Sequence, residues 1–179
     1  MRDTLDRSIL DRFVQGDQSA FEAVYRHYEA DAYRWILRIV RDEDGAEDVL
    51  VEAFWRAYRG RARFDSSRSF GAWMRRIATH ASLDHLKAKR RHAGSTATDA
   101  KTPATEAPDR VLQDSIAVAF QRLPPKLKVA ATLALLEEQP YAEIADALGV
   151  PVGTVKSRVF RATRALRKEL ARLGYDHER

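Results

Sequence analysis

The spacing of apolar residues restricts the fold of this chain more than any other feature. From Phe21 to Ile39, apolar residues recur every three or four positions, which is the period of one face of a long helix. The same period returns over residues 46–57 and 70–81, and again in several segments after Asp109. No convincing strand pattern or internal repeat occurs, so the sequence predicts an all-α protein.

Residues that start and stop helices set the limits of these segments. We expect a short first helix over residues 5–14, ended at Gly16, which can take the left-handed cap conformation. A third helix is expected over residues 46–57. The acidic residues 42–44 directly before it suit the positive end of its dipole. The polar stretch 59–68 shows neither the helical nor the strand period and predicts a loop. Ser69 can cap a fourth helix. Its apolar side is formed by Phe70, Trp73, Ile77 and Ala81, with Met74 and Ala78 beside it.

The composition changes between residues 92 and 108, where Gly, Ser, Thr, Ala and Pro dominate. Too few large apolar residues remain to offset the entropy of ordering such a segment. We therefore predict two small helical domains, residues 1–91 and 109–179, joined by a flexible linker. A linker of about 17 residues has a mean span of roughly 20 to 25 Å and a reach of about 55 Å. It can hold the two domains more than one DNA turn apart.

The C-terminal domain contains the layout of a helix-turn-helix. Two short helices, separated at Pro124 and Pro125, are expected to precede it and to end near Leu136. Within residues 141–155, Ile144 and Leu148 face inward from the first helix, and Gly149 permits the tight turn. A long helix then begins near Pro151, and its inward line is Val155, Val159, Ala162, Leu166 and Leu170.

That inward line leaves a polar and basic face on the outside of the last helix. Side chains near the start of such a helix reach base edges in a major groove. We therefore assign base reading to Lys156, Ser157 and Arg161, with Phe160 available for a thymine methyl group. Thr154, Arg158 and Arg164 are better placed for phosphates. A solvated basic helix is the alternative, and the ordered turn residues argue against it.

Charge and cysteine content limit the partners. The chain has 31 Lys and Arg against 26 Asp and Glu, a net charge of +5, which favours a polyanionic partner without identifying it. It has no cysteine, which excludes a disulfide framework or a thiolate metal site. No segment approaches the roughly 20 apolar residues that cross a bilayer, so we expect a cytoplasmic protein without membrane insertion.

The run from Tyr141 to Arg164, centred on residues 151–158, resembles the minus-thirty-five recognition motif of extracytoplasmic function sigma factors. In that family the positions of Lys156, Ser157, Phe160 and Arg161 approach the promoter. Pro140 stands where the family usually has Ser. The resemblance extends over residues 21–91 and implies a transcription initiation factor, with core RNA polymerase and promoter DNA as its partners.

Residues 46–54 resemble the polymerase-binding helix of the same family. The resemblance implies that Glu47, Asp48, Val51 and Glu52 dock on the clamp helices of the largest polymerase subunit. Gly45 replaces a usual Asp and Val51 a usual Gln, which leaves those two contacts open. A solvated acidic face is the plainer interpretation. Glu47, Asp48 and Glu52 do not indicate a metal site, because no His or further carboxylate is suitably spaced to complete one.

Residues 64–91 resemble the stretch that melts and reads the minus-ten element. A flipped base needs a polar pocket beside a basic surface. Two groups of residues offer such a pocket and surface. One of them includes His80, which stands where the family commonly has Asn. The loop supplies Phe64, Asp65, Ser66, Ser67 and Arg68, and one stripe of the following helix supplies Arg76, His80, Lys87 and Arg91. Trp73 can stack on a base, but its place between Phe70 and Ile77 favours a core role.

Two other classes of function fit parts of the pattern. A helix-turn-helix repressor would dimerise or bind an effector through its N-terminal half and would bind a palindrome alone. A nucleic-acid enzyme would use the acidic helix, but the chain lacks a metal or nucleophile constellation. We therefore expect no catalytic residue, no metal and no cofactor. An anti-sigma protein that holds the two domains is a further hypothesis, motivated by the linker and the exposed polymerase-binding face.

Overall fold

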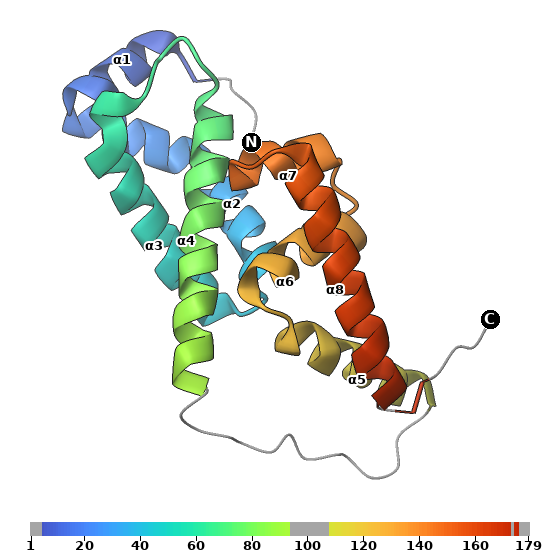
Figure 1. Cartoon of the computed structure of the whole chain (residues 1–179). Helices are drawn as coiled ribbons and strands as arrows, with labels where there is room; N and C mark the ends of the chain where they lie inside the picture. Colours follow the sequence, from blue (N-terminus) through green and yellow to red (C-terminus); the bar gives the residue numbers. More distant parts are fainter. Residues whose placement is uncertain (1–4, 94–107, 173, 176–179) are drawn as a thin grey trace. The chain divides into compact units, whose positions relative to one another are not determined.

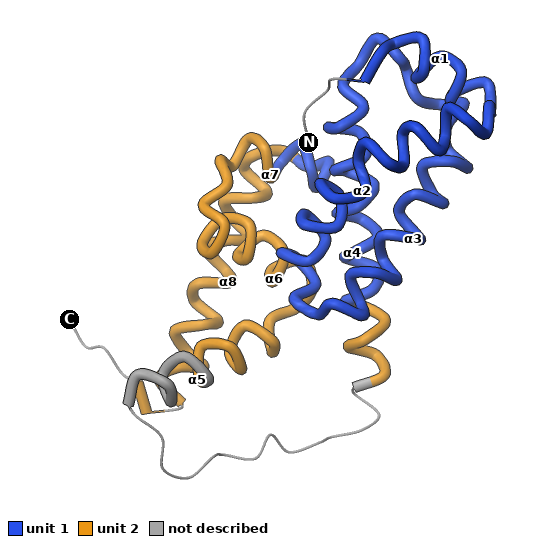
Figure 2. Tube along the Cα trace, turned by 180° about the vertical axis from the view of Figure 1, so that it is seen from behind, with its two compact units in different colours: residues 1–86, 145–150 blue, residues 87–144, 151–179 orange. Residues whose placement is uncertain are grey.

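A computed structural model describes residues 5–93, 108–172 and 174–175 (Figure 1). Within these ranges every regular element is helical and no strand occurs, which confirms the all-α prediction. The chain divides into two compact units (Figure 2). The first comprises residues 1–86 with 145–150, and the second comprises residues 87–144 with 151–179. Of the predicted linker, 92–108, residues 94–107 lie outside the described residues.

Within residues 5–93, the structure contains four α-helices and one 3-10 turn. They are α1 (Arg7–Gln15), α2 (Gln18–Val40), α3 (Glu43–Gly60), η1 (Arg61–Arg63) and α4 (Phe70–Ala93). The expected caps are present: Gly16 ends α1 with φ 89°, and Ser69 Oγ accepts a hydrogen bond from the Ala72 N–H at 3.0 Å. Asp17 caps α2 by accepting from the Ala20 N–H at 3.0 Å.

The loop predicted over residues 59–68 is shorter than expected. Helix α3 continues to Gly60, and η1 follows it directly. The Arg61 guanidinium lies 4.3 Å from the Tyr58 ring centre and donates to the Tyr58 carbonyl at 2.9 Å. It also covers Gly16, where a β-carbon would lie only 2.9 Å from Nη2. Arg61 therefore packs against α1 and Tyr58, a contact between separate helices that the local polar pattern does not reveal.

Helix α4 is rotated relative to the predicted apolar side. Phe70, Met74 and Ala78 are fully buried, whereas Trp73 and Ile77 are only half-buried. Two hydroxyl side chains share the buried side, because each satisfies itself on the helix: Thr79 donates to the Arg75 carbonyl and Ser82 to the Ala78 carbonyl, both at 2.8 Å. Polar residues on the inward face of α4 therefore shifted the apolar pattern by about one position.

Five further elements lie in the described residues from Pro108 onward. They are α5 (Pro108–Arg122), α6 (Pro125–Ala131), the π-helical segment η2 (Thr132–Leu136), α7 (Tyr141–Leu148) and α8 (Val152–Arg172). The break at the two prolines is confirmed, with Pro125 in the first turn of α6. The uniform helix expected from Leu127 to Leu136 is wrong at its end. There the Glu137 N–H bonds to the Thr132 carbonyl at 3.1 Å, five residues back.

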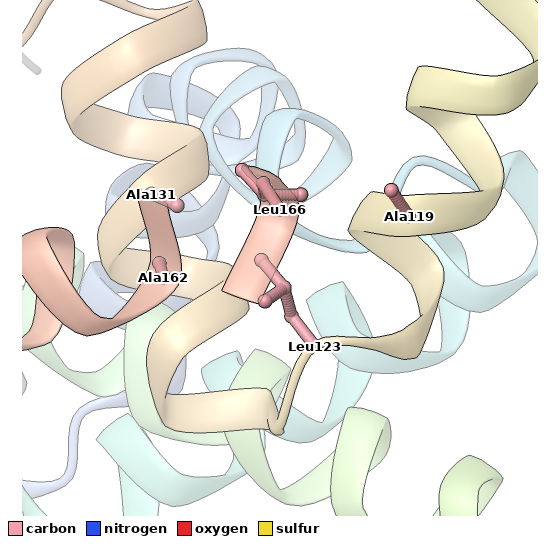
Figure 3. Close-up of a cluster of buried hydrophobic side chains, with 5 residues drawn as sticks. All are labelled: Ala119, Leu123, Ala131, Ala162 and Leu166. Carbon is pink, nitrogen blue, oxygen red and sulfur yellow. The ribbon is translucent and has the colours of Figure 1, made fainter. Parts of the chain in front are cut away.

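A small apolar cluster holds the second unit together. Ala119 and Leu123 come from α5, Ala131 from α6, and Ala162 and Leu166 from α8 (Figure 3). The partly buried Phe120, Leu127 and Leu170 pack against it. Two of the inward residues predicted for the last helix therefore lie in this cluster. No helix among the described residues is long and apolar enough to cross a bilayer.

Candidate nucleic-acid and protein interfaces

The segment from α7 to α8 forms the predicted helix-turn-helix. Gly149 has φ 62°, and the Val150 N–H bonds to the Ala145 carbonyl at 3.0 Å, which closes the end of α7. Ile144 and Leu148 are buried, as expected. Pro151 precedes α8, and its carbonyl accepts from the Thr154 N–H at 2.9 Å. The turn residues therefore have the conformations that their types predicted.

Helix α8 has one buried and one cationic side. Val155, Val159, Ala162 and Leu166 are buried, which confirms the predicted inward line, and Leu170 is half-buried. The opposite side exposes Lys156, Ser157, Phe160, Arg161 and Arg164, while Thr154 and Arg158 are half-buried. Phe160 is 63% exposed, an unusual position for a large aromatic ring.

The charge on this side of α8 is of one sign. Residues 152–168 contain no carboxylate, and their cations are Lys156, Arg158, Arg161, Arg164, Arg167 and Lys168. Glu169 comes one residue later, and it pairs with Arg122 of α5 and with Arg172 at 2.9 Å. Those two arginines lower the pKa of Glu169, Arg172 more strongly. The part of α8 before Glu169 is therefore a cationic surface without a carboxylate that would repel a phosphate.

The outward side of α4 carries the second predicted group. Arg76, His80, Lys87 and Arg91 are all exposed. His80 Nδ1 lies 2.8 Å from the Arg76 carbonyl, which can only accept, so Nδ1 carries the proton. In the neutral ring, Nε2 is then an acceptor that faces away from the helix backbone.

A cavity of about 290 Å³ opens between α3 and α4. Arg56, Trp73, Arg76, Ile77 and His80 line it. Arg56 is held by Glu52 at 2.7 Å and Asp84 at 2.9 Å, and these carboxylates raise the pKa of its guanidinium. The sequence pattern missed Arg56, because it lies on a different helix from the other polar residues of the cavity.

The loop before α4 is held by bonds among its own side chains and by one bond to α1. Asp65 accepts from the Ser67 N–H at 3.0 Å and the Ser67 hydroxyl at 2.6 Å, and these bonds, the hydroxyl first, lower the pKa of its carboxyl group. Arg68 lies 3.4 Å from Asp65, and the Ser66 hydroxyl donates to Asp11. Phe64 differs from the expectation, since it is 6% exposed and packs on Phe70 and Trp73 at ring distances of 5.2 and 4.8 Å. It is a core residue and does not present its ring to a base.

The outward side of α3 contains the acidic group. Glu47, Asp48 and Val51 are exposed, and Glu52 is half-buried by its bonds to Arg56 and Arg59. Trp55, one turn after Val51, is 52% exposed and was not among the predicted residues. Among the described residues, no group of three or more His, Asp or Glu is arranged to hold a metal ion.

Comparison with known proteins decides between the classes of function. The profile of Sigma-70 region 2 matches residues 24–92, and the profile of Sigma-70, region 4, matches residues 113–166. The RNA polymerase sigma-H factor of Pseudomonas aeruginosa is 36% identical over 180 residues, which cover 92% of this chain and 93% of that protein. The chain belongs to the extracytoplasmic function (ECF) family of RNA polymerase sigma factors.

Other relatives of this sigma factor agree. ECF RNA polymerase sigma factor SigW of Bacillus subtilis is 33% identical over 87% of this chain and 91% of its own length. ECF RNA polymerase sigma factor SigM of Mycobacterium tuberculosis is 33% identical over 95% of this chain and 85% of its own length. The resemblance predicted from the helix-turn-helix motif is therefore confirmed, and neither matching profile describes a catalytic domain.

Two solved structures share the fold of the sigma factor. CnrH, in complex with the cytosolic domain of CnrY, has a TM-score of 0.56 and 21% identity, and the match covers 93% of this chain and 97% of CnrH. RpoE of Bartonella quintana, in complex with the anti-sigma factor NepR, has a TM-score of 0.53 and 20% identity. The match covers 84% of this chain and 96% of RpoE.

Proposed function

We propose that this ECF sigma factor binds core RNA polymerase through α3, reads a bipartite promoter through α4 and α8, and opens the DNA at the upstream edge of the bubble. Its functional division is into an N-terminal domain (1–91), a tether (92–108) and a C-terminal domain (109–179). The factor acts in the cytoplasm and has no catalytic residue, so the phosphodiester chemistry belongs to the polymerase. The observation that carries this proposal is the carboxylate-free cationic side of α8 in a chain of this family.

Helix α8 reads the minus-thirty-five element. Lys156, Ser157 and Arg161 contact base edges, and the exposed ring of Phe160 packs on a thymine methyl group. Thr154, Arg158 and Arg164 hold the phosphates on either side. Arg161 Nε donates to the Ser157 carbonyl at 3.3 Å, and the two Nη groups of the guanidinium supply the donors for a base.

Helix α4 and the cavity beside it capture the minus-ten element. Arg76, Lys87 and Arg91 attract the phosphate backbone, and His80 offers one hydrogen bond to a base. The polar loop 65–68 lies before this helix and supplies further donors and acceptors. Flipping a base costs a few kcal/mol, and contacts with the half-buried ring of Trp73 offset part of it.

Helix α3 binds the polymerase. Glu47, Asp48, Val51 and Glu52 dock on the clamp helices of the largest subunit, where an acidic and apolar surface suits a basic helical partner. A partner that blocks this face would keep the factor inactive, and anti-sigma proteins are the class that we propose for that role. The complexes of CnrH and RpoE with partner proteins support this suggestion.

Transcription in vitro tests the proposal. Core polymerase of the source organism, supplied with this protein and a pool of genomic promoters, should give specific transcripts that core alone does not give. A gel shift separates the factor from a helix-turn-helix repressor. The sigma factor should bind promoter duplex strongly only with core enzyme, whereas tight binding of a palindrome by the protein alone would contradict the proposal.

A further inference from the structure

The outward side of α3 changes in character along its length. The helical period places Asp44, Asp48, Val51, Trp55 and Arg59 in one stripe, and all five are exposed. The stripe is acidic in its first turns, apolar in its middle and basic at its end. Glu47, beside the acidic turns, is exposed as well. We call these six residues the α3 stripe.

The apolar middle of the α3 stripe is exposed but well ordered. Val51 is 66% and Trp55 52% exposed, and they are the only two of the large exposed apolar side chains in the described residues that are four positions apart. The Trp55 ring stacks on Tyr58 at 6.1 Å and 19°, and the Arg59 guanidinium lies 5.6 Å from its centre. A large ring held on two sides loses little conformational freedom on binding, which favours a binding hot spot.

The charges restrict what can cover this apolar pair. Asp44, Glu47 and Asp48 repel a phosphate backbone, so nucleic acid does not fit the first turns of α3. A helix lying along the stripe needs basic side chains opposite these carboxylates and an acidic side chain opposite Arg59. The rise of 1.5 Å per residue puts these two charged ends about 18 Å apart. The reverse orientation would place like charges together.

We propose that Val51 and Trp55 are the energetic centre of the polymerase-binding surface, and that the occupant is a polymerase helix with a basic, aliphatic and acidic order along about 18 Å. This inference rests on the proposed function. It adds Trp55 to the binding residues, and it assigns the acidic residues to orientation and association rate. The Gln that is usual at position 51 in the family would not supply this apolar contact.

The test measures association and dissociation of the full-length protein with core RNA polymerase. Trp55→Ala should weaken binding roughly 10- to 100-fold, mainly through faster dissociation, because it removes a side chain that the partner buries in the complex. Trp55→Leu keeps an apolar side chain and should retain most of the affinity. Val152→Ala, at an exposed apolar residue of α8, is the control and should bind core as the wild type does.

A charge reversal tests the orientation. Arg59→Glu should slow association and change its dependence on salt, since an acidic residue of the partner then meets a like charge. Arg26→Glu changes the net charge equally on another helix, α2, and should leave the association rate close to wild type. Circular dichroism and thermal melts of each variant exclude loss of folding as the cause.

The outcomes separate the inference from the function on which it rests. Wild-type protein that fails to bind core polymerase overturns both. Wild-type binding that Trp55→Ala leaves unchanged overturns only the inference. Sedimentation that shows a Trp55-dependent dimer of the free protein, with binding to core unaffected, also overturns it, because the stripe would then serve a second copy. Faster dissociation of Trp55→Ala, with Trp55→Leu near wild type, supports it.

Discussion

The hydrogen bond between Trp35 and Thr79 gives the sharpest prediction about the fold of the first unit. Trp35 Nε1, on α2, donates to Thr79 Oγ1, on α4, at 2.9 Å. Thr79 is fully buried and Trp35 is 6% exposed, so water cannot readily replace the acceptor. Thr79→Val closely preserves the shape of the side chain and replaces its hydroxyl group by a methyl group. The indole N–H is then left without its partner in the core.

The expected loss follows from that burial. An unsatisfied buried donor costs about 1 to 3 kcal/mol, whereas the replacement of both partners by apolar groups is close to neutral. For a unit of this size, 1 kcal/mol lowers the midpoint of thermal unfolding by about 4 to 8 °C. Thr79→Val should therefore lower the melting temperature by at least about 4 °C. The loss of the bond from Thr79 to the Arg75 carbonyl adds little, since that carbonyl remains within the helix.

A double-mutant cycle isolates the bond from other effects of the substitutions. Unfolding in urea, followed by far-ultraviolet circular dichroism, is measured for wild type, Thr79→Val, Trp35→Phe and the double variant. In the Trp35→Phe background no indole donor remains, so Thr79→Val should cost at least about 1 kcal/mol less than in wild type. An equal cost in both backgrounds would refute the argument that this bond fastens α4 to α2.

Three further predictions concern DNA reading, the core and acid stability. Arg161→Ala should lose about 1 to 3 kcal/mol at one base position in a promoter-binding series, and an equal loss on random DNA would reduce Arg161 to a phosphate contact. Phe64→Ala should cost about 3 to 5 kcal/mol in urea unfolding, because the ring is buried, and a variant of wild-type stability with impaired promoter opening would contradict the core assignment. Bonds from the Ser19 hydroxyl, the Ala20 N–H and Arg12 hold the pKa of Asp17 well below its usual value. Its contribution to stability is therefore complete above about pH 4 and is lost on further acidification, so the difference in melting temperature between wild type and Asp17→Asn should shrink there.

The local features of this sigma factor could be predicted from its sequence. The inward line of α8 and the left-handed turns at Gly16 and Gly149 depend on residues within a few positions of each other. Such features follow from the helical period and from the conformational range of glycine. The family could be recognised for the same reason, since the helix-turn-helix motif is contiguous in sequence.

Features that depend on contacts between helices were missed. Phe64 follows a polar stretch and looked like a loop residue, but Phe70 and Trp73 cover it. Trp73 itself is divided between the core and the cavity, so neither predicted role describes it fully. The π-helical end of α6 had no recognisable signal either, because one extra residue in a turn leaves the apolar content unchanged.

Gly45 and Val51, the two departures of α3 from the family pattern, differ in consequence, because one faces the core and the other faces outward. Gly45 is buried, and a β-carbon there would lie 2.9 Å from both His85 Nε2 and Asp42 Oδ2. The usual Asp would fit only with a shift of the Asp42 and His85 side chains, so Gly45 is a buried packing position and not part of the exposed face of α3. Val51 is 66% exposed and one turn from Trp55, so its change from Gln alters the surface that a partner meets. On the proposed binding of α3 to the polymerase, we expect substitutions at position 51 and at Trp55, one turn later, to change the affinity, and substitutions at position 45 to act through stability.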